Sequence, residues 1–379
     1  MKKSIKKATR ILLLVLVISL VIVFGVSCTT AAATTTAAAA TTAAATVAET
    51  TVVAGETEVA AETKSAFQGA EGETYHMLVF VTGVEYWIPV YEMFKECGKQ
   101  LGVKTVYSGT PEYDINKQLT VFEQVIATNP TGIYLCPMQP DPFIEPINRA
   151  IEQGIAITTF ATDSPKSNRQ IFITSDNVRE GTYAATRLAE EIGGKGKLAV
   201  LRNPGQLNHD IRVDTFVKTI KENYPDITIV GDAASNQDPE KAYQAVLTMA
   251  QKDPDLGGVF MPEANSGMGA AQAAKELGGT IKVLCCDVNK QILDMIKAGD
   301  IWGAINPNQG MQGYFGMLTL FVTAHPDLVD PMNEDKAMGK NPVTLPFVDN
   351  NLSIVTKDNV DYYYLDKYLE RRGSKGVEE

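Results

Sequence analysis

The sequence predicts an α/β protein of two similar lobes, each a doubly wound parallel sheet with helices on both faces. Short apolar runs typical of buried strands alternate with longer segments in which apolar residues recur at helical spacing. This alternation reaches residues 171–174 and then starts again after Gly196. One sheet does not need so many strand–helix units. We therefore predict two lobes, with the chain crossing between them near Ser175 and again near Asn306.

The first strand–loop–helix unit, HMLVFVTGVEYWIPVYEMFKECGKQLGV, begins with an apolar run at residues 76–82. Gly83 ends the run, and the apolar residues after it follow a helical period. Ligands of open α/β sheets bind at the carboxyl ends of strands, so the loop at residues 83–87 is a candidate binding segment. Tyr86 and Trp87 could cover the flat face of a ligand there. Taken alone, Trp87 could equally pack the helix onto the sheet.

The other predicted elements follow the same pattern. In the first lobe we predict strands at residues 104–107, 132–135, 155–160 and 171–174, and helices at 115–127 and from 141 to 153. The crossing near Ser175 leads into a long helix at residues 179–192. In the second lobe we predict strands at 198–201, 227–230, 257–260, 281–285 and 301–305, and helices at 211–223, 239–251, 266–277, 290–298 and 310–323.

The first 27 residues have the features of an export signal. Five basic side chains precede an apolar stretch at residues 11–24, which is short for a membrane span. Gly25 and Ser27 are small and precede Cys28, an arrangement that resembles a bacterial lipoprotein signal. We expect residues 1–27 to be a signal peptide and Cys28 to be the lipidation site. An uncleaved anchor helix is the alternative, and either would tether the protein to a membrane.

Residues 28–72 are rich in Ala and Thr and lack the periodicity that would bury a core, so we predict a disordered linker. The whole chain has a formal net charge of −11, and removal of the basic signal would leave it more acidic. Such a chain is a poor ligand for nucleic acid, and we expect no nucleic-acid partner.

Several segments together resemble a known family. They are LGVKTVYSGTPEYDINKQLTVFEQVI, GIYLCPMQPDPFIEPINRAIEQGIAITTFATDS, FITSDNVREGTYAATRLAEEIGGKGKLAVL, GVFMPEANSGMGAAQAAKEL and IKVLCCD. In order and spacing, residues 76–356 are similar to the type I periplasmic binding proteins, the sugar receptors of ABC importers, in the branch that binds ribose, rhamnose and autoinducer-2. The resemblance implies two lobes that close on a small ligand and are joined by a three-strand hinge.

The resemblance and the strand pattern together suggest the domain boundaries. We expect the N-terminal lobe to comprise residues 76–175 plus 307–335. The C-terminal lobe is expected to comprise residues 176–306 plus 336–356, and residues 357–379 form a C-terminal tail that could contain a helix.

The family places its ligand contacts at strand ends. The matching positions in this chain are Tyr86, Trp87, Asp141, Thr162, Asp163, Asn208, His209, Asp210, Glu263, Asn265, Asp287 and Asn306. This chain departs from the family at three places: Ala161 replaces a frequent acid, Asp210 stands where ribose receptors have arginine, and Asn306 stands near the usual position of a glutamine. Arg212 is expected to brace its helix.

These residue types suit a monosaccharide or a small polyol. Carboxylates and amides hydrogen bond to vicinal hydroxyls, and an aromatic ring covers the C–H face of a sugar. Simpler roles remain open, because Asp141 could cap a helix and Asp163 and Asp287 could be turn residues. The many acids also permit a cationic ligand. A sensory or chemotaxis receptor for the same ligand class is a further alternative.

Enzyme and metal motifs are not found. The sequence contains no GxSxG, P-loop or HExxH motif, and His209 has no second histidine at ligand spacing. We predict no catalytic residues, no metal and no cofactor. The cysteines Cys97, Cys136, Cys285 and Cys286 suggest buried free thiols, although a disulfide is possible in an exported protein.

The expected partners are a sugar or polyol and the ABC permease. We expect a monomer outside the cytoplasm, held at the bacterial cell membrane by its N-terminal lipid.

Overall fold

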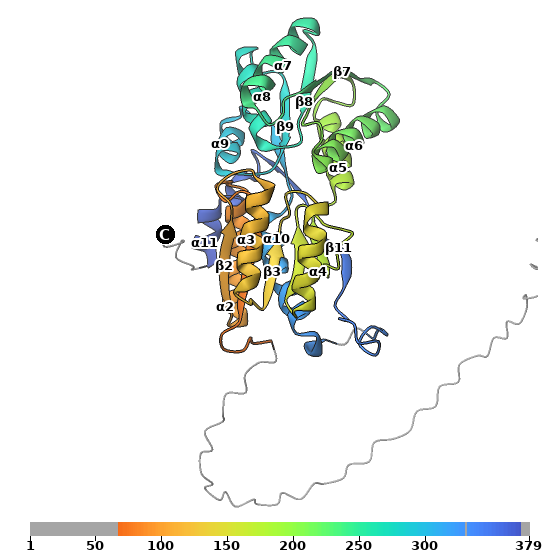
Figure 1. Cartoon of the computed structure of the whole chain (residues 1–379). Helices are drawn as coiled ribbons and strands as arrows, with labels where there is room; N and C mark the ends of the chain where they lie inside the picture. The colour runs from red at the N-terminus through yellow and green to blue at the C-terminus, as the bar shows by residue number, and fades with distance from the viewer. Residues whose placement is uncertain (1–66, 330–331, 373–379) are drawn as a thin grey trace, which may run out of the picture. The chain divides into compact units, whose positions relative to one another are not determined.

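The computed structural model describes residues 67–329 and 332–372. The predicted signal peptide at residues 1–27, the predicted lipidation site Cys28 and the first part of the predicted linker lie outside these residues. Among the helices in the described ranges, none is long and apolar enough to cross a membrane. The described chain forms two α/β lobes, each built on a six-stranded sheet (Figure 1).

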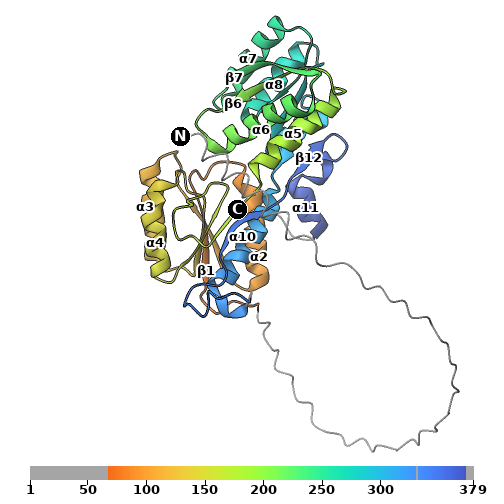
Figure 2. The same cartoon turned by 90° about the vertical axis from the view of Figure 1, so that its right-hand side faces the viewer.

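The first sheet has the strand order β11-β5-β4-β3-β1-β2, and all of its neighbours are parallel. Helices α2 and α10 cover one face, while α3 and α4 cover the other (Figure 2). The strands are β1 Thr74–Val79, β2 Lys104–Gly109, β3 Gly132–Leu135, β4 Ala156–Phe160, β5 Ile171–Thr174 and β11 Leu345–Asp349. The helices are α2 Trp87–Leu101, α3 Ile115–Ala127, η1 Asp141–Phe143, α4 Ile144–Glu152, α10 Gln309–Ala324 and η2 Pro326–Leu328.

The second sheet repeats this order as β12-β10-β9-β8-β6-β7, with only the β12–β10 pair antiparallel. Helices α5 and α6 pack on one face, and α7, α8 and α9 pack on the other. The strands are β6 Gly196–Arg202, β7 Ile227–Ala234, β8 Leu256–Phe260, β9 Lys282–Cys286, β10 Gly303–Asn306 and β12 Ser353–Thr356. The helices are α5 Asn177–Glu191, α6 Leu207–Asn223, α7 Pro239–Lys252, α8 Ala264–Glu276, α9 Lys290–Ala298, η3 Val360–Tyr362 and α11 Leu365–Arg372.

Three segments join the two sheets. The chain leaves the first lobe between β5 and α5, returns between β10 and α10, and crosses again between β11 and β12. This confirms the predicted fold class of two similar parallel-sheet lobes with a three-segment hinge.

One predicted boundary is wrong. Residues 336–356 were assigned to the C-terminal lobe, but β11 pairs in parallel with β5 of the first sheet. Leu345 lies opposite Ile171 and Asp349 opposite Thr174. The outer edge of β5 thus gains a neighbouring strand, and the last crossing comes only after residue 349.

Aspartate caps fix where several helices begin, and a glycine lets two of the first-lobe helices pack closely. The Asp114, Asp176 and Asp238 side chains each accept two backbone N–H groups at the starts of α3, α5 and α7. Gly313 lets α10 pack directly against α2, because a Cβ atom there would lie 1.9 Å from the Val90 carbonyl oxygen. The first turn of α10 is therefore fixed beside the start of α2.

The C-terminal tail docks on the second lobe as far as it is described. The Tyr363 hydroxyl donates to Ser353 Oγ at 3.1 Å, and the Tyr364 hydroxyl donates to Asp294 at 2.7 Å. Lys297 forms an ion pair with Asp361. The described cysteines, Cys97, Cys136, Cys285 and Cys286, are buried and free.

Candidate functional site

A cavity of about 370 Å³ is lined by both lobes. The first lobe contributes the loop after β1 and the start of α10, and the second lobe contributes the segments after β7, β8 and β9. This volume is in the range of small-molecule sites. Four of the predicted positions line it: Tyr86, Glu263, Asn265 and Asp287.

Tyr86 forms part of the first-lobe wall. It precedes α2, and its hydroxyl donates to Gln312 Oε1 at 3.1 Å. Burial raises the pKa of Tyr86 well above 10, and the Asp287 carboxylate adds to the rise. The phenol is therefore neutral, and it lines the same cavity as Asp287 of the second lobe.

Trp87 does not line the cavity. Its side chain is 4% exposed and packs edge-on against Phe80 and Phe160, with ring centroids 5.6 Å and 5.7 Å away. The Tyr86 ring contacts it from the cavity side, 4.9 Å away. Trp87 is therefore part of the first-lobe core, and only its neighbour Tyr86 reaches the cavity.

Glu263 and Asn265 lie at the start of α8. The Glu263 carboxylate accepts the backbone N–H of Asn265 at 2.6 Å and that of Ser266 at 3.1 Å, so it caps the helix. Glu263 is nevertheless part of the cavity lining, and the Asn265 side chain is exposed there. One acid thus fixes the backbone of this wall and also presents negative charge to the cavity.

Asp287 follows β9 in the left-handed conformation, with φ of 69°. Its backbone N–H donates to Ile305 O at 2.8 Å, which fixes the residue at the carboxyl edge of the sheet. Desolvation raises the pKa of Asp287 to about 7, Arg212 opposes this rise, and Glu180 and Glu263 add to it. Near neutral pH this carboxyl group can therefore either donate or accept a hydrogen bond.

A buried ion pair supports the second-lobe wall. Arg212 of α6 pairs with Glu180 of α5, and its Nη1 donates to Pro262 O at 2.9 Å, directly before Glu263. Burial opposes the charge of Arg212 and is the largest single effect, but Glu180 and the other acidic groups nearby, Asp287 among them, together outweigh it and raise the pKa of Arg212. Ser175, in the first crossing, donates to Glu180. Arg212 therefore braces the second-lobe wall, as well as its own helix.

Asn208, His209 and Asp210 lie in the first turn of α6, which starts four residues earlier than predicted, so they are not in a loop. The Asp210 carboxylate accepts the Gly205 N–H at 3.0 Å and favours this earlier helix start. Asn208 is half-buried. None of the three lines the cavity.

His209 supports the cavity indirectly. Burial lowers its pKa to about 3, so the ring is neutral, and its Nδ1 accepts from Asn203 Nδ2 at 3.0 Å. The Asn203 side-chain oxygen in turn accepts the N–H of Gln237 at 2.7 Å. Gln237 lines the cavity, so His209 helps to hold this turn in place.

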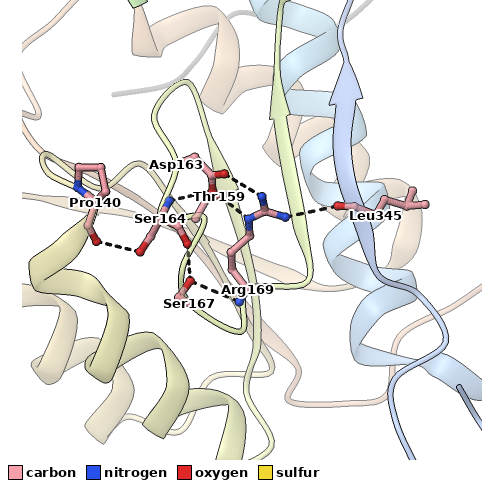
Figure 3. A network of polar contacts seen from close by, with 7 residues as sticks. All are labelled: Pro140, Thr159, Asp163, Ser164, Ser167, Arg169 and Leu345. Carbon is pink, nitrogen blue, oxygen red and sulfur yellow. Dashed lines mark hydrogen bonds and ion pairs between the residues drawn. The ribbon is translucent and has the colours of Figure 1, made fainter. Parts of the chain in front are cut away.

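Asp163 lies outside the cavity in a polar network (Figure 3). Arg169 binds both of its carboxylate oxygens, at 2.9 Å and 2.7 Å, and Thr159 and Ser164 donate to the same group. Arg169 also reaches Leu345 O at 3.4 Å. Asp163 therefore organises the loop after β4 and links it to β11.

Three more predicted positions do not line the cavity either. Thr162 donates to Pro137 O, and the 70% exposed Asp141 side chain pairs with Lys166 at 3.1 Å. Asp141 is the first residue of η1, and its side chain caps neither η1 nor α4, so its alternative role as a helix cap is not observed. Asn306 is buried, and its amide nitrogen donates to Ser353 Oγ at 3.3 Å, which links β10 to β12 within the second sheet.

Five further polar residues of the described chain line the cavity and were not among the predicted positions. They are Glu85, Gln237, Asn289, Gln291 and Gln309. Glu85 and Asn289 lie beside predicted strand-end positions and could have been found from that rule. Gln237 lies between β7 and α7, and Gln309 begins α10 after β10. The sequence around these two residues does not distinguish them from ordinary surface glutamines.

A family model described as a periplasmic binding protein domain matches residues 76–322. The chain belongs to the periplasmic binding protein family. Among its relatives is the D-allose-binding periplasmic protein of Escherichia coli K12, with 24% identity over 265 residues, 67% of this chain and 84% of the relative. Family membership implies a location outside the cytoplasm, and it confirms the prediction that the chain is a binding protein and not an enzyme.

Solved structures of this family agree with the fold. The arabinose-binding protein AraP of Geobacillus stearothermophilus is 34% identical, with a TM-score of 0.72, covering 77% of this chain and 99% of that one. A sugar-binding protein of a sugar ABC transporter from Bacillus halodurans is 32% identical, with a TM-score of 0.73, covering 77% of this chain and all of that one. The predicted resemblance to type I periplasmic binding proteins is confirmed.

Proposed function

We propose that this protein is the substrate receptor of an ABC importer and binds a monosaccharide or small polyol in the cavity between its lobes. The observation that carries the proposal is Asp287. Its carboxyl group is partly desolvated at the cavity wall, and no hydrogen bond within the described chain engages it. A ligand hydroxyl can supply the missing partner.

The rest of the lining supports a polar, uncharged ligand. Glu263 and Asn265 lie on the same lobe as Asp287, and Tyr86 offers aromatic surface from the other lobe. We propose these four residues as ligand contacts. At the other predicted positions, ligand contact stays a prediction: Trp87, Asp141, Thr162, Asp163, Asn208, His209, Asp210 and Asn306. The sugars named for the relatives, such as allose and arabinose, are consistent with this ligand class.

A cationic ligand is the second candidate. Glu85, Glu263 and Asp287 all line the cavity, and no Lys or Arg is among the described residues that do so. We rank this candidate lower, because the names of the relatives refer to sugars and a polyol, such as allose, arabinose and xylitol.

The membrane attachment and the partners are part of the same proposal. The signal-like segment before Cys28 supports a lipid anchor, and an anchored monomer would deliver its ligand to the permease. A sensory receptor would bind the same ligands and differ only in its membrane partner.

A thermal-shift screen tests the proposed ligand class. The panel contains D-arabinose, D-ribose, D-allose, D-xylose and xylitol, together with small amines as a separate arm. We expect at least one sugar or polyol to raise the unfolding temperature in a saturable manner. A response confined to the amines would refute the sugar proposal and favour the cationic ligand.

A further inference from the structure

Gln309 is an uncommitted amide at the cavity. It is the first residue of α10, is 4% exposed and belongs to the cavity lining. Its Nε2 atom is buried and has no hydrogen-bond partner within the described chain. Buried amides are normally paired, because an unpaired donor loses its water without compensation.

A second buried glutamine shows the usual arrangement. Gln118 of α3 is fully buried, and both ends of its amide are paired. Its nitrogen donates to Cys136 O at 2.8 Å, and its oxygen accepts the Met138 N–H at 2.9 Å. Gln309 therefore differs from Gln118. It also differs from Gln312, whose Nε2 is likewise unpaired but whose oxygen accepts the Tyr86 hydroxyl and which does not line the cavity.

The backbone of Gln309 is firmly placed. Gly313 fixes α10 against α2, and one turn after Gln309 the Gln312 side chain accepts the Tyr86 hydroxyl. The amide lies on the first lobe, whereas the carboxylates of Glu263 and Asp287 belong to the second. The terminal torsion of a glutamine is broad, so rotation of the amide can turn its nitrogen toward the cavity.

We propose that Gln309 determines ligand specificity by donating a hydrogen bond to a ligand oxygen. This inference rests on the proposed function and adds an orientation to it. The ligand presents an acceptor oxygen, such as a ring oxygen, to the first lobe. It presents hydroxyl hydrogens to Glu263 and Asp287 on the second lobe. Among these three residues, Gln309 then donates from the first lobe while Glu263 and Asp287 accept from the second, so a bound ligand pairs with both walls.

Two matched substitutions test this role, Gln309→Met and Gln118→Met, each replacing a buried glutamine with an apolar side chain of similar length. Thermal unfolding is measured without ligand, and calorimetry measures the binding of D-arabinose, D-ribose, D-allose and xylitol. For Gln309→Met we expect an unchanged or higher ligand-free unfolding temperature and an affinity at least about tenfold lower. For Gln118→Met we expect a lower unfolding temperature and an affinity close to that of the wild type.

A third variant tests the donor, since Gln309→Glu keeps the size but offers acceptors in place of the amide N–H group. We expect it to lose as much affinity as Gln309→Met. Wild-type affinity in either Gln309 variant would overturn the inference and leave the proposed function intact. A ligand-free unfolding temperature that falls as far in Gln309→Met as in Gln118→Met would also overturn it. A wild-type protein that binds none of these ligands would overturn both.

Discussion

The substitution Asp287→Asn removes a titrating group from the cavity while keeping the size of the side chain. In the folded protein, desolvation holds the pKa of Asp287 at about 7, compared with 3.8 for an ordinary aspartate. The folded protein therefore binds this proton more tightly than the unfolded chain. Between about pH 4 and pH 7 unfolding releases the proton, so the free energy of unfolding falls as the pH rises.

The size of this effect follows from the pKa difference. The stabilising contribution of the protonated group is fully present below the unfolded pKa and is lost as the pH rises through about 7. Each pKa unit corresponds to about 1.36 kcal/mol, which sets an upper limit of about 4 kcal/mol for the whole window. Asp287 is only partly buried, and solvent screening reduces the expected change to roughly 2 kcal/mol.

Urea unfolding of the wild type and of Asp287→Asn across this pH range measures the effect. We expect the stability of the variant relative to the wild type to rise by roughly 2 kcal/mol between about pH 4 and pH 7 and then to level off. Other titrating groups are common to both proteins and largely cancel in the difference. Parallel stability curves would show that burial does not raise the pKa of Asp287, and would refute this reasoning.

Two further substitutions test the supports of the cavity. Glu180→Gln leaves the buried Arg212 without its carboxylate and should lower the free energy of unfolding by about 3–5 kcal/mol. The control Glu190→Gln disrupts the exposed Arg187–Glu190 pair on the same helix and should lower the free energy of unfolding by less than about 1 kcal/mol. An equal loss of stability in the two variants would contradict a special role of the buried pair. Trp87→Ala should cost about 3–5 kcal/mol in urea unfolding, because Trp87 fills the first-lobe core, whereas Trp87→Phe should cost less. A Trp87→Ala protein of wild-type stability that loses ligand affinity would instead show that Trp87 acts as a ligand contact.

Part of the cavity could be predicted, because parallel strands end at the same edge of a sheet. Tyr86, Glu263 and Asp287 all follow strands, namely β1, β8 and β9. Their convergence requires only the strand order of the two lobes and the crossing between them. The repeated strand–helix pattern indicated two parallel-sheet lobes and the crossings between them, and the family resemblance indicated the strand-end positions. The strand order comes from the structure.

The same rule could not tell which strand-end acids would be neutralised by nearby bases. Asp163 pairs with Arg169 and Asp141 pairs with Lys166, and neither acid lines the cavity. These contacts depend on the path of the loop after β4, and the spacing of apolar residues in the sequence does not predict the path of a loop. Gln309 was not predicted either. It was singled out by an unpaired buried amide nitrogen, and a sequence does not show which side chains remain unpaired after folding.

The last lobe boundary shows a similar limit. β11 and β12 are short strands separated by only residues 350–352, yet they belong to different sheets. The strand pattern and the family resemblance place residues 336–356 in the second lobe. Only the unpaired edge of β5, a tertiary feature, determines that residues 345–349 join the first sheet.

Isothermal titration calorimetry with the sugar panel, on the wild type and on Asn265→Trp, tests most directly whether the interlobe cavity binds sugar. Asn265 is exposed and lines the cavity, so a tryptophan there would fill the binding space without entering the core. We predict saturable one-to-one binding of at least one sugar to the wild type, and at least about a hundredfold weaker binding to the variant. Absence of sugar binding by the wild type, or equal affinity in a folded Asn265→Trp protein, would contradict a sugar site in this cavity.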